Sequence, residues 1–144
     1  MASAISRSSC YLADCLFCKI IQGIIPSNKI IETEFSYSFL DIGPLSKGHA
    51  LVIPKYHAEF LHQVPDEYLA DMLPVAKKVA LAIGVPHYNL LQNNGKIAHQ
   101  VVPHTHFHII PKPNAEEGLI MEWNAQKPSS DELKEEMSRI MDSL

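Results

Sequence analysis

Three histidines alternate with other residues in the segment His104-Thr105-His106-Phe107-His108. On a β-strand, alternate side chains lie on one face, about 6.6 Å apart at ~3.3 Å per residue. Imidazoles in such a row can bind a metal, donate hydrogen bonds to an anion or attack an electrophile. A solvent-exposed edge strand would explain one such histidine more readily than three, so the segment indicates a functional site.

Two cysteines, Cys15 and Cys18, lie two residues apart at the start of an apolar segment. This spacing occurs both in zinc sites and in redox motifs. The redox interpretation is weak, because no thioredoxin-like βαβ pattern follows. A structural zinc ion and a pair of buried free thiols are therefore the two alternatives.

Short elements must position these side chains. Helical spacing of apolar residues predicts a short helix over 16–21, a long helix from an Asp66 N-cap to about Ile83 with Leu73 in its buried stripe, and a C-terminal helix over about 130–143. Apolar β-rich runs predict strands over 29–32, 35–41, 49–53, 88–91 and 104–110. This order is not a regular βαβ alternation, so we expect an α+β fold with an antiparallel sheet of about five strands and two main helices.

Composition limits the class of protein. The chain has 144 residues and a formal net charge of −4, with 47% hydrophobic and 19% charged residues, as expected for one domain, over 15–144, after a disordered tail over 1–14. The acidic balance argues against a nucleic-acid partner, and the absence of a long apolar run argues against a membrane partner. Three cysteines do not form a secreted disulfide framework. We expect a cytoplasmic location, with the nucleus left open as a second one.

The histidine row, followed by Ile109 and Ile110, resembles the histidine-triad motif of the HIT superfamily. Further segments resemble its Hint branch, the histidine triad nucleotide-binding proteins: Cys15–Ile21, Phe39–Ile42, Gly48–Lys55, Asn93-Asn94-Gly95 and Gln100. The stretch Leu91–Gln100 looks most like the fungal adenosine 5′-monophosphoramidases of that branch. Several separate motifs in the same order make the resemblance specific.

The resemblance implies a HIT-like sheet that continues across a homodimer, and a purine nucleotide substrate. It also implies hydrolysis of the P–N bond of adenosine 5′-monophosphoramidates, and of related AMP conjugates such as acyl adenylates, through a covalent nucleotidyl-histidine intermediate. AMP and an amine are the products, and no catalytic cofactor is needed. In this chain the nucleophile would be His106, whose neutral imidazole offers one lone pair.

Other residues take roles by the same resemblance. His108 would contact the phosphate, and His49 would support the triad. Asp41 would accept hydrogen bonds from the ribose hydroxyls. The remaining nucleotide contacts would come from the loop residues Asn93, Gln100 and Val101 and from an apolar slot of Phe17, Ile20, Phe39, Ile42 and Leu51. An ordinary hydrophobic core is the alternative interpretation of these five apolar residues.

Two positions depart from the pattern of the branch. Val101 stands where a serine close to the leaving amine is common, which puts the delivery of a proton to that amine in question. His99 stands where glycine is frequent. We expect His99 to lie near the mouth of the site and to affect the choice of leaving group.

Some HIT proteins with a cysteine pair bind a structural zinc ion. In this chain the corresponding ligands would be Cys15, Cys18, His57 and His104. Two other functions stay open: a zinc-dependent hydrolase with the three alternating histidines as ligands, and a non-catalytic purine-nucleotide-binding scaffold. No carboxylate that could act as a general base stands near the triad in the sequence, which disfavours the hydrolase.

Overall fold

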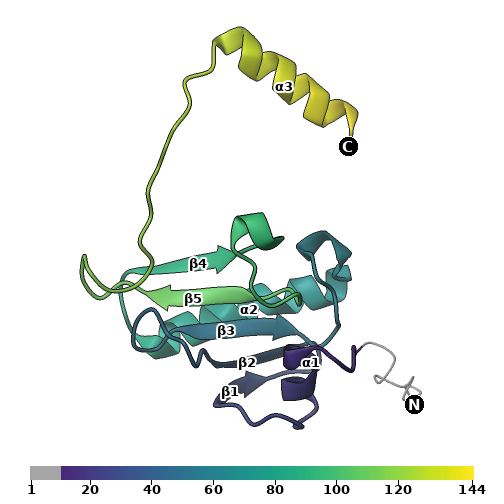
Figure 1. Ribbon diagram of the computed structural model, residues 1–144, viewed down its shortest axis with the longest axis vertical. Coiled ribbons are helices and arrows are strands. Elements are labelled where there is room, and N and C mark those ends of the chain that lie inside the picture. Colours follow the sequence, from purple (N-terminus) through teal and green to yellow (C-terminus); the bar gives the residue numbers. More distant parts are fainter. Residues whose placement is uncertain (1–10) are drawn as a thin grey trace.

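The computed structural model describes residues 11–144 (Figure 1). Its centre is a five-stranded antiparallel sheet in the order β1-β2-β3-β5-β4. The strands are β1 (Lys29–Glu32), β2 (Ser36–Leu40), β3 (Ala50–Pro54), β4 (Tyr88–Gln92) and β5 (Phe107–Pro111), and the helices are α1 (Leu16–Ile21), α2 (Asp66–Ile83) and α3 (Ser130–Asp142). This confirms the predicted α+β class, the five strands and the two long helices.

The central strand β3 is buried on both faces, since two hydrophobic clusters use alternate residues of it. Leu51 and Ile53 pack with the residues of α1, whereas Ala50 and Val52 pack with those of α2. Helix α2 therefore covers one face of the sheet and the short helix α1 lies against the other (Figure 1).

Helix α2 differs in detail from its prediction. Pro65 is the N-cap and Asp66 is the first helical residue. Leu73 is 51% exposed, while Val75 is buried in its place. Met72, Val75, Ala76 and Val79 have the spacing of a single helix face, and Leu73 lies about 100° around the helix from Met72.

The predicted strand over 104–110 begins only at Phe107. Pro103 has no backbone N–H to give to a neighbouring strand, and His104 N–H donates to the Val102 carbonyl instead, at 2.8 Å. The next N–H, that of Thr105, donates to Ala58, at 2.7 Å, and not to β3 or β4. His104 and His106 therefore precede β5, and the expected alternation of three imidazoles on one strand face is wrong for this segment.

The two ends of the chain lie outside the sheet. Residues 1–10 of the expected N-terminal tail fall outside the described residues, but Tyr11 packs against the cluster of α1. At the other end, Ser129 accepts a hydrogen bond from the N–H of Glu132, at 3.1 Å, and α3 follows an extended segment that carries it away from the sheet (Figure 1). No helix within residues 11–144 is long and apolar enough to cross a membrane.

Candidate active site

His106 is a buried imidazole with one ring nitrogen held by the backbone. Its Nδ1 lies 2.7 Å from the carbonyl oxygen of His104. Because a carbonyl can only accept, we assign the proton to Nδ1, which leaves a lone pair on Nε2. The ring of Phe17 packs edge-on against it, with centroids 5.1 Å apart. Burial lowers the pKa of His106, so the neutral, nucleophilic form is favoured.

A chain of hydrogen bonds assigns the opposite tautomer to His108. The N–H of Leu45 donates to Nδ1 of His49, at 3.1 Å, so the proton of His49 is on Nε2. That Nε2 lies 3.0 Å from Nδ1 of His108, which must then accept. The remaining proton of His108 is therefore on Nε2, where it can be donated to a ligand. The His106 and His108 ring centroids are 4.8 Å apart, so a lone pair and an N–H donor lie side by side.

The charge state of this pair is neutral. Burial lowers the pKa of His108 to about 4, with smaller contributions from His106 and His49 in the same direction. Burial also lowers the pKa of His49, although Asp41, with Oδ2 3.5 Å from His49 Nε2, acts in the opposite direction. Hence these histidines act near neutral pH as hydrogen-bonding groups and not as cations.

An apolar cavity of about 340 Å³ opens beside His106. Its walls include all five residues predicted to form the apolar slot. Four of them also belong to the hydrophobic core: Phe17, Ile20, Phe39 and Leu51. These side chains are therefore core residues that also form the wall of a cavity, and their contact with a purine base stays a prediction. Ile42 and Val101 line the same cavity from exposed positions, at 93% and 89% exposure. The cavity is an apolar slot with the histidine pair at one side.

A larger cavity of about 620 Å³ lies on the other side of His108. It shares only Asp41 and His108 with the apolar slot. The rest of its wall includes Asn93, His99 and the segment over 119–123, which contains Glu122 and Trp123. His106 lines the slot but not this cavity.

The loop between β4 and β5 is fixed by a buried glutamine. Gln100 accepts a hydrogen bond from the N–H of Gly95, at 2.7 Å, and donates to the carbonyl of Glu59, at 2.7 Å. Both polar ends of this side chain are thus occupied within the protein, and Gln100 lines neither cavity. Its contact with a nucleotide stays a prediction, whereas its contact with the loop is direct. Asn93 does face the larger cavity, and its Nδ2 donates to the carbonyl of His99, at 3.4 Å.

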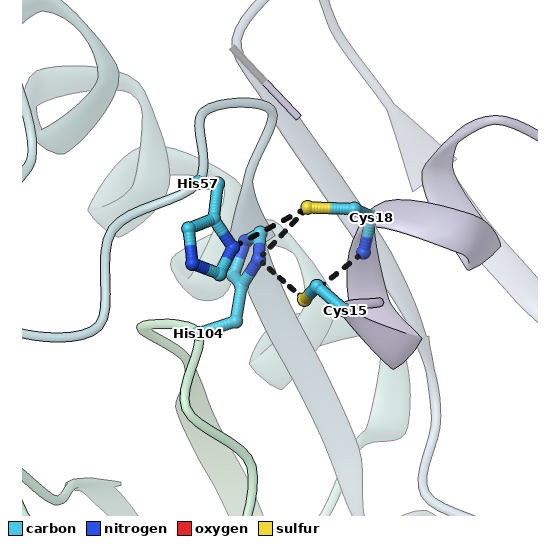
Figure 2. Close-up of side chains that lie close together, drawn as sticks. All are labelled: Cys15, Cys18, His57 and His104. Atoms are coloured by element: carbon cyan, nitrogen blue, oxygen red, sulfur yellow. Dashed lines mark hydrogen bonds between the residues drawn. The ribbon is translucent and has the colours of Figure 1, made fainter. Parts of the chain in front are cut away.

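Figure 2 shows a second cluster, in which the cysteine pair of α1 faces two histidines. Sγ of Cys18 lies 3.4 Å from Nδ1 of His57. Nδ1 of His104 lies 3.4 Å from Sγ of Cys15 and 3.6 Å from Sγ of Cys18. All four potential ligand atoms lie within 4.8 Å of one another. The four residues predicted as a zinc site are therefore brought together.

The donor set also fits zinc by distance. A tetrahedral zinc ion with Zn–S of about 2.3 Å and Zn–N of about 2.0 Å has S···N edges of about 3.5 Å, close to the sulfur–nitrogen distances of this cluster. His104 donates from Nε2 to the carbonyl of Pro54, at 3.0 Å, so its Nδ1 lone pair points at the thiols. Burial raises the pKa of Cys18 to about 12, so the isolated thiol stays protonated near neutral pH, and a cation would be needed to favour the thiolate.

The side chain of His104 therefore points to a different site from those of His106 and His108. Its ring faces the cysteines, and only its backbone carbonyl serves the active site, as the acceptor for His106. The three alternating histidines do not converge on one point, which disfavours the zinc-dependent hydrolase that would use them as ligands.

Comparison with known proteins decides the family. The HIT domain model matches residues 22–115, more than half of the chain. The chain belongs to the HIT domain family. Among HIT relatives, it is 58% identical to adenosine 5′-monophosphoramidase of Saccharomyces cerevisiae over 121 residues, 84% of this chain and 77% of that protein. It is 59% identical to adenosine 5′-monophosphoramidase of Schizosaccharomyces pombe over 120 residues, 83% and 90% of the two chains.

Solved HIT structures have the same fold. A histidine triad nucleotide-binding protein from Candida albicans is similar with a TM-score of 0.86 and 48% identity, covering 90% of this chain and 96% of that one. A hypothetical protein from Leishmania major is similar with a TM-score of 0.85 and 49% identity, covering 91% and 96%. The resemblance inferred from the motifs is therefore confirmed at the level of family and fold.

Sequence reasoning missed the groups of this HIT site that act through the backbone. The N–H of Leu45 sets the tautomer of His49, and the carbonyl of Glu59 holds Gln100. The identity of Leu45 or Glu59 does not predict such a role, since every residue has the same backbone carbonyl and almost every residue has the same backbone N–H. The segment over 119–123 lines the larger cavity of its own subunit.

Proposed function

We propose that this chain is an adenosine 5′-monophosphoramidase that cleaves the P–N bond of AMP amides and releases AMP and an amine. One observation carries the proposal: the Nε2 lone pair of His106 lies beside the Nε2–H of His108 at the side of an apolar slot. Relatives 58% and 59% identical carry this name. Acyl adenylates share the same phosphorus chemistry and are proposed as further substrates.

The proposed binding mode follows from the two kinds of wall. The purine would occupy the apolar slot between Phe17, Phe39 and Leu51. Asp41, at the border of the slot, would accept hydrogen bonds from the ribose hydroxyls. The α-phosphate would then lie between His106 and His108, with the side-chain amide of Asn93 as a further donor on the far side.

In the first proposed step, Nε2 of His106 attacks phosphorus and the P–N bond breaks, so the amine leaves with the electron pair and takes up a proton. The carbonyl of His104 keeps the attacking ring in the correct tautomer and accepts a stronger hydrogen bond as that ring becomes positive. The Nε2–H of His108 stabilises the charge on the phosphoryl oxygens. In the second step, water attacks phosphorus and gives up a proton to solvent while the bond between phosphorus and His106 Nε2 breaks. AMP is released and neutral His106 is regenerated.

A trapping experiment tests the proposal. Rapid quenching of the protein with adenosine 5′-phosphoramidate radiolabelled on phosphorus should leave label on His106, found by peptide mass spectrometry. His106→Ala should carry no label, and its turnover rate should fall by roughly 10⁴-fold or more. The exposed His87→Ala is the matched control and should keep both. Full turnover by His106→Ala would rule out the covalent route, and tight AMP binding without turnover would favour a scaffold.

We also propose a structural zinc ion on Cys15, Cys18, His57 and His104. Zinc there would contribute folding free energy by joining α1 to the segment before β5. Elemental analysis of protein purified without added metal should give close to one zinc per chain. His57→Asn and Cys18→Ser should each lose most of it, whereas less than a tenth of an equivalent in the unaltered protein would rule the site out.

A homodimer is the third part of the proposal. Strands β1 and β4 form the two edges of the sheet, and an edge strand offers unpaired backbone groups to another chain. Antiparallel pairing of two β4 strands would join the sheets of two subunits, as the family resemblance implies.

A further inference from the structure

The departing amine needs a proton that the histidine pair does not supply. An alkylamine cannot leave as its anion, so its nitrogen must be protonated as the P–N bond breaks. The only proton of His106 is on Nδ1, turned toward the carbonyl of His104. Neutral His108 could give up its Nε2 proton only by becoming an imidazolate, because its Nδ1 already accepts from His49. Val101 is apolar and has no proton to give.

The larger cavity lies where the amine would leave. In phosphoryl transfer the attacking and leaving atoms are roughly in line on opposite sides of phosphorus. His106 attacks from the slot, whereas His108 borders both the slot and the larger cavity. A phosphate held between these two histidines would therefore direct the amine past His108 into the 620 Å³ cavity.

Four titratable groups besides His108 line this cavity, and three of them are unsuitable as acids. Asp41 accepts a hydrogen bond from the N–H of Gly43, at 2.8 Å, as expected for a carboxylate. Both ring nitrogens of His49 are engaged, by Leu45 and by His108. Glu122 is exposed, and a carboxylate accepts hydrogen bonds but does not donate them. His99 is the fourth.

The backbone at His99 is held in a costly conformation. Its φ of 68° is in the left-handed region, and no other residue except glycine within 11–144 has a positive φ. A residue other than glycine adopts this region only at a cost in free energy. The His99 N–H donates to the Lys96 carbonyl, at 3.0 Å, and the next residue, Gln100, is anchored at both ends of its amide. This anchored loop therefore holds a water-exposed imidazole at the wall of the cavity.

We infer that His99 is the general acid of the first step and that the larger cavity is the leaving-group subsite. The inference rests on the proposed phosphoramidase function. As the His106–phosphorus bond forms and the P–N bond breaks, the electron pair stays on the amine nitrogen and takes a proton from imidazolium His99. Neutral His99 then accepts a proton from the attacking water in the second step or regains one from solvent.

A pair of substrates with different leaving groups tests this role. The single-turnover rate of nucleotidyl-His106 formation is measured with an N-alkyl adenosine 5′-phosphoramidate and with the p-nitrophenyl ester of AMP, whose leaving group needs no proton. His99→Asn is the test variant, because asparagine tolerates left-handed backbone. It should slow the reaction of the phosphoramidate by roughly 100-fold, and the fold reduction for the ester should be at least ten times smaller. His87→Asn, an exposed histidine outside both cavities, is the matched control and should slow neither.

Two results would overturn the inference. Equal slowing of both substrates by His99→Asn would mean that His99 only positions the loop, and unchanged rates with both would mean that it has no role in either step. Failure of the proposed function gives a different result, since the unaltered protein would then label His106 with neither substrate.

Discussion

Each histidine of the site takes its role from the group that holds its other ring nitrogen. A carbonyl on Nδ1 makes His106 a lone-pair donor at Nε2, and an N–H donor on Nδ1 of His49 makes His108 a proton donor at Nε2. His104, with a carbonyl on Nε2, presents its lone pair to the cysteines. Chemically identical side chains thus serve as nucleophile, hydrogen-bond donor and metal ligand, and the difference is set by backbone groups.

The depressed pKa of His108 predicts a pH dependence of stability. The unfolded chain takes up a proton at this residue near pH 6.5, but the folded chain only near pH 4. The contribution of neutral His108 to the free energy of unfolding is therefore complete above pH 6.5 and is lost as the pH falls toward 4. Between pH 7 and pH 5 we expect the free energy of unfolding of the unaltered protein to fall by roughly 1–2 kcal/mol more than that of His108→Gln.

Urea denaturation at the two pH values measures this difference. The NMR titration of the His108 ring should have its midpoint near the low value of about 4. A midpoint close to 6.5 would contradict the burial argument.

At the scale of elements, the segment after β5 is joined to the loop before β3. The N–H of Gly118 donates to the carbonyl of Leu45, at 3.1 Å, and Ser46 donates to the carbonyl of Pro111, at 2.6 Å. Leu45 is also the residue whose N–H sets the tautomer of His49. The wall formed by residues 119–123 and the histidine pair therefore depend on the same loop.

Gly118→Ala tests this junction. A Cβ at this position would lie 2.6 Å from the carbonyl oxygen of Pro111, at a φ of +86°. We expect the free energy of unfolding to fall by about 2 kcal/mol or more, and KM for substrates with bulky amines to rise. Gly84→Ala is the control, because its φ is +78° but no atom lies within 4 Å of the added Cβ, and it should cost only about 1 kcal/mol. Equal losses of free energy of unfolding in the two variants would contradict the close approach of residue 118 to the carbonyl oxygen of Pro111.

Helix α1 has only six residues and depends on its contacts. Its N-cap residue Cys15 and its Cys18 face the two histidines of the zinc cluster, while Phe17 between them packs on the His106 ring. Removal of zinc by a chelator should therefore lower the melting temperature by roughly 5–10 °C. His57→Asn should already melt at the lower temperature and respond little to the chelator, whereas His87→Asn should behave like the unaltered protein. A melting temperature unchanged by complete removal of zinc would contradict the proposal that zinc joins α1 to the segment before β5.

At the scale of the whole molecule, much apolar surface stays uncovered in a single chain. Helix α3 has no buried residue. Four of its apolar residues and the last residue of the chain are exposed: Leu133, Met137, Ile140, Met141 and Leu144. A helix of 13 residues is marginal in water without packing. The edge strand β4 likewise exposes Tyr88 and Leu90.

The proposed dimer predicts the effect of a charge on that edge. The unaltered protein should sediment at twice the 16.1 kDa of one chain. Leu90→Asp on β4 should shift the equilibrium toward the monomer by about tenfold or more in dissociation constant. Ile24→Asp, an exposed residue just after α1, should leave the mass unchanged. A monomeric unaltered protein at micromolar concentration would rule out the sheet-joined dimer.

The sequence by itself was sufficient to predict the antiparallel α+β class, the helices and strands within a few residues, and the set of histidines and cysteines that meet in the two clusters. The helices and strands follow from the local periodicity of side chains. The members of the two clusters were predicted from the resemblance to the HIT superfamily. The period-two argument failed at His104, because the hydrogen bonds of His104 and Thr105 go to Val102 and Ala58 and not to a neighbouring strand.

Only the tertiary structure decided which way each imidazole points, which nitrogen holds the proton, and that two cavities meet at His108. The deciding groups are backbone amides and carbonyls of residues such as Leu45 and Pro54, far from the triad in sequence. Because every residue type offers the same backbone groups, no pattern of side chains could have identified them.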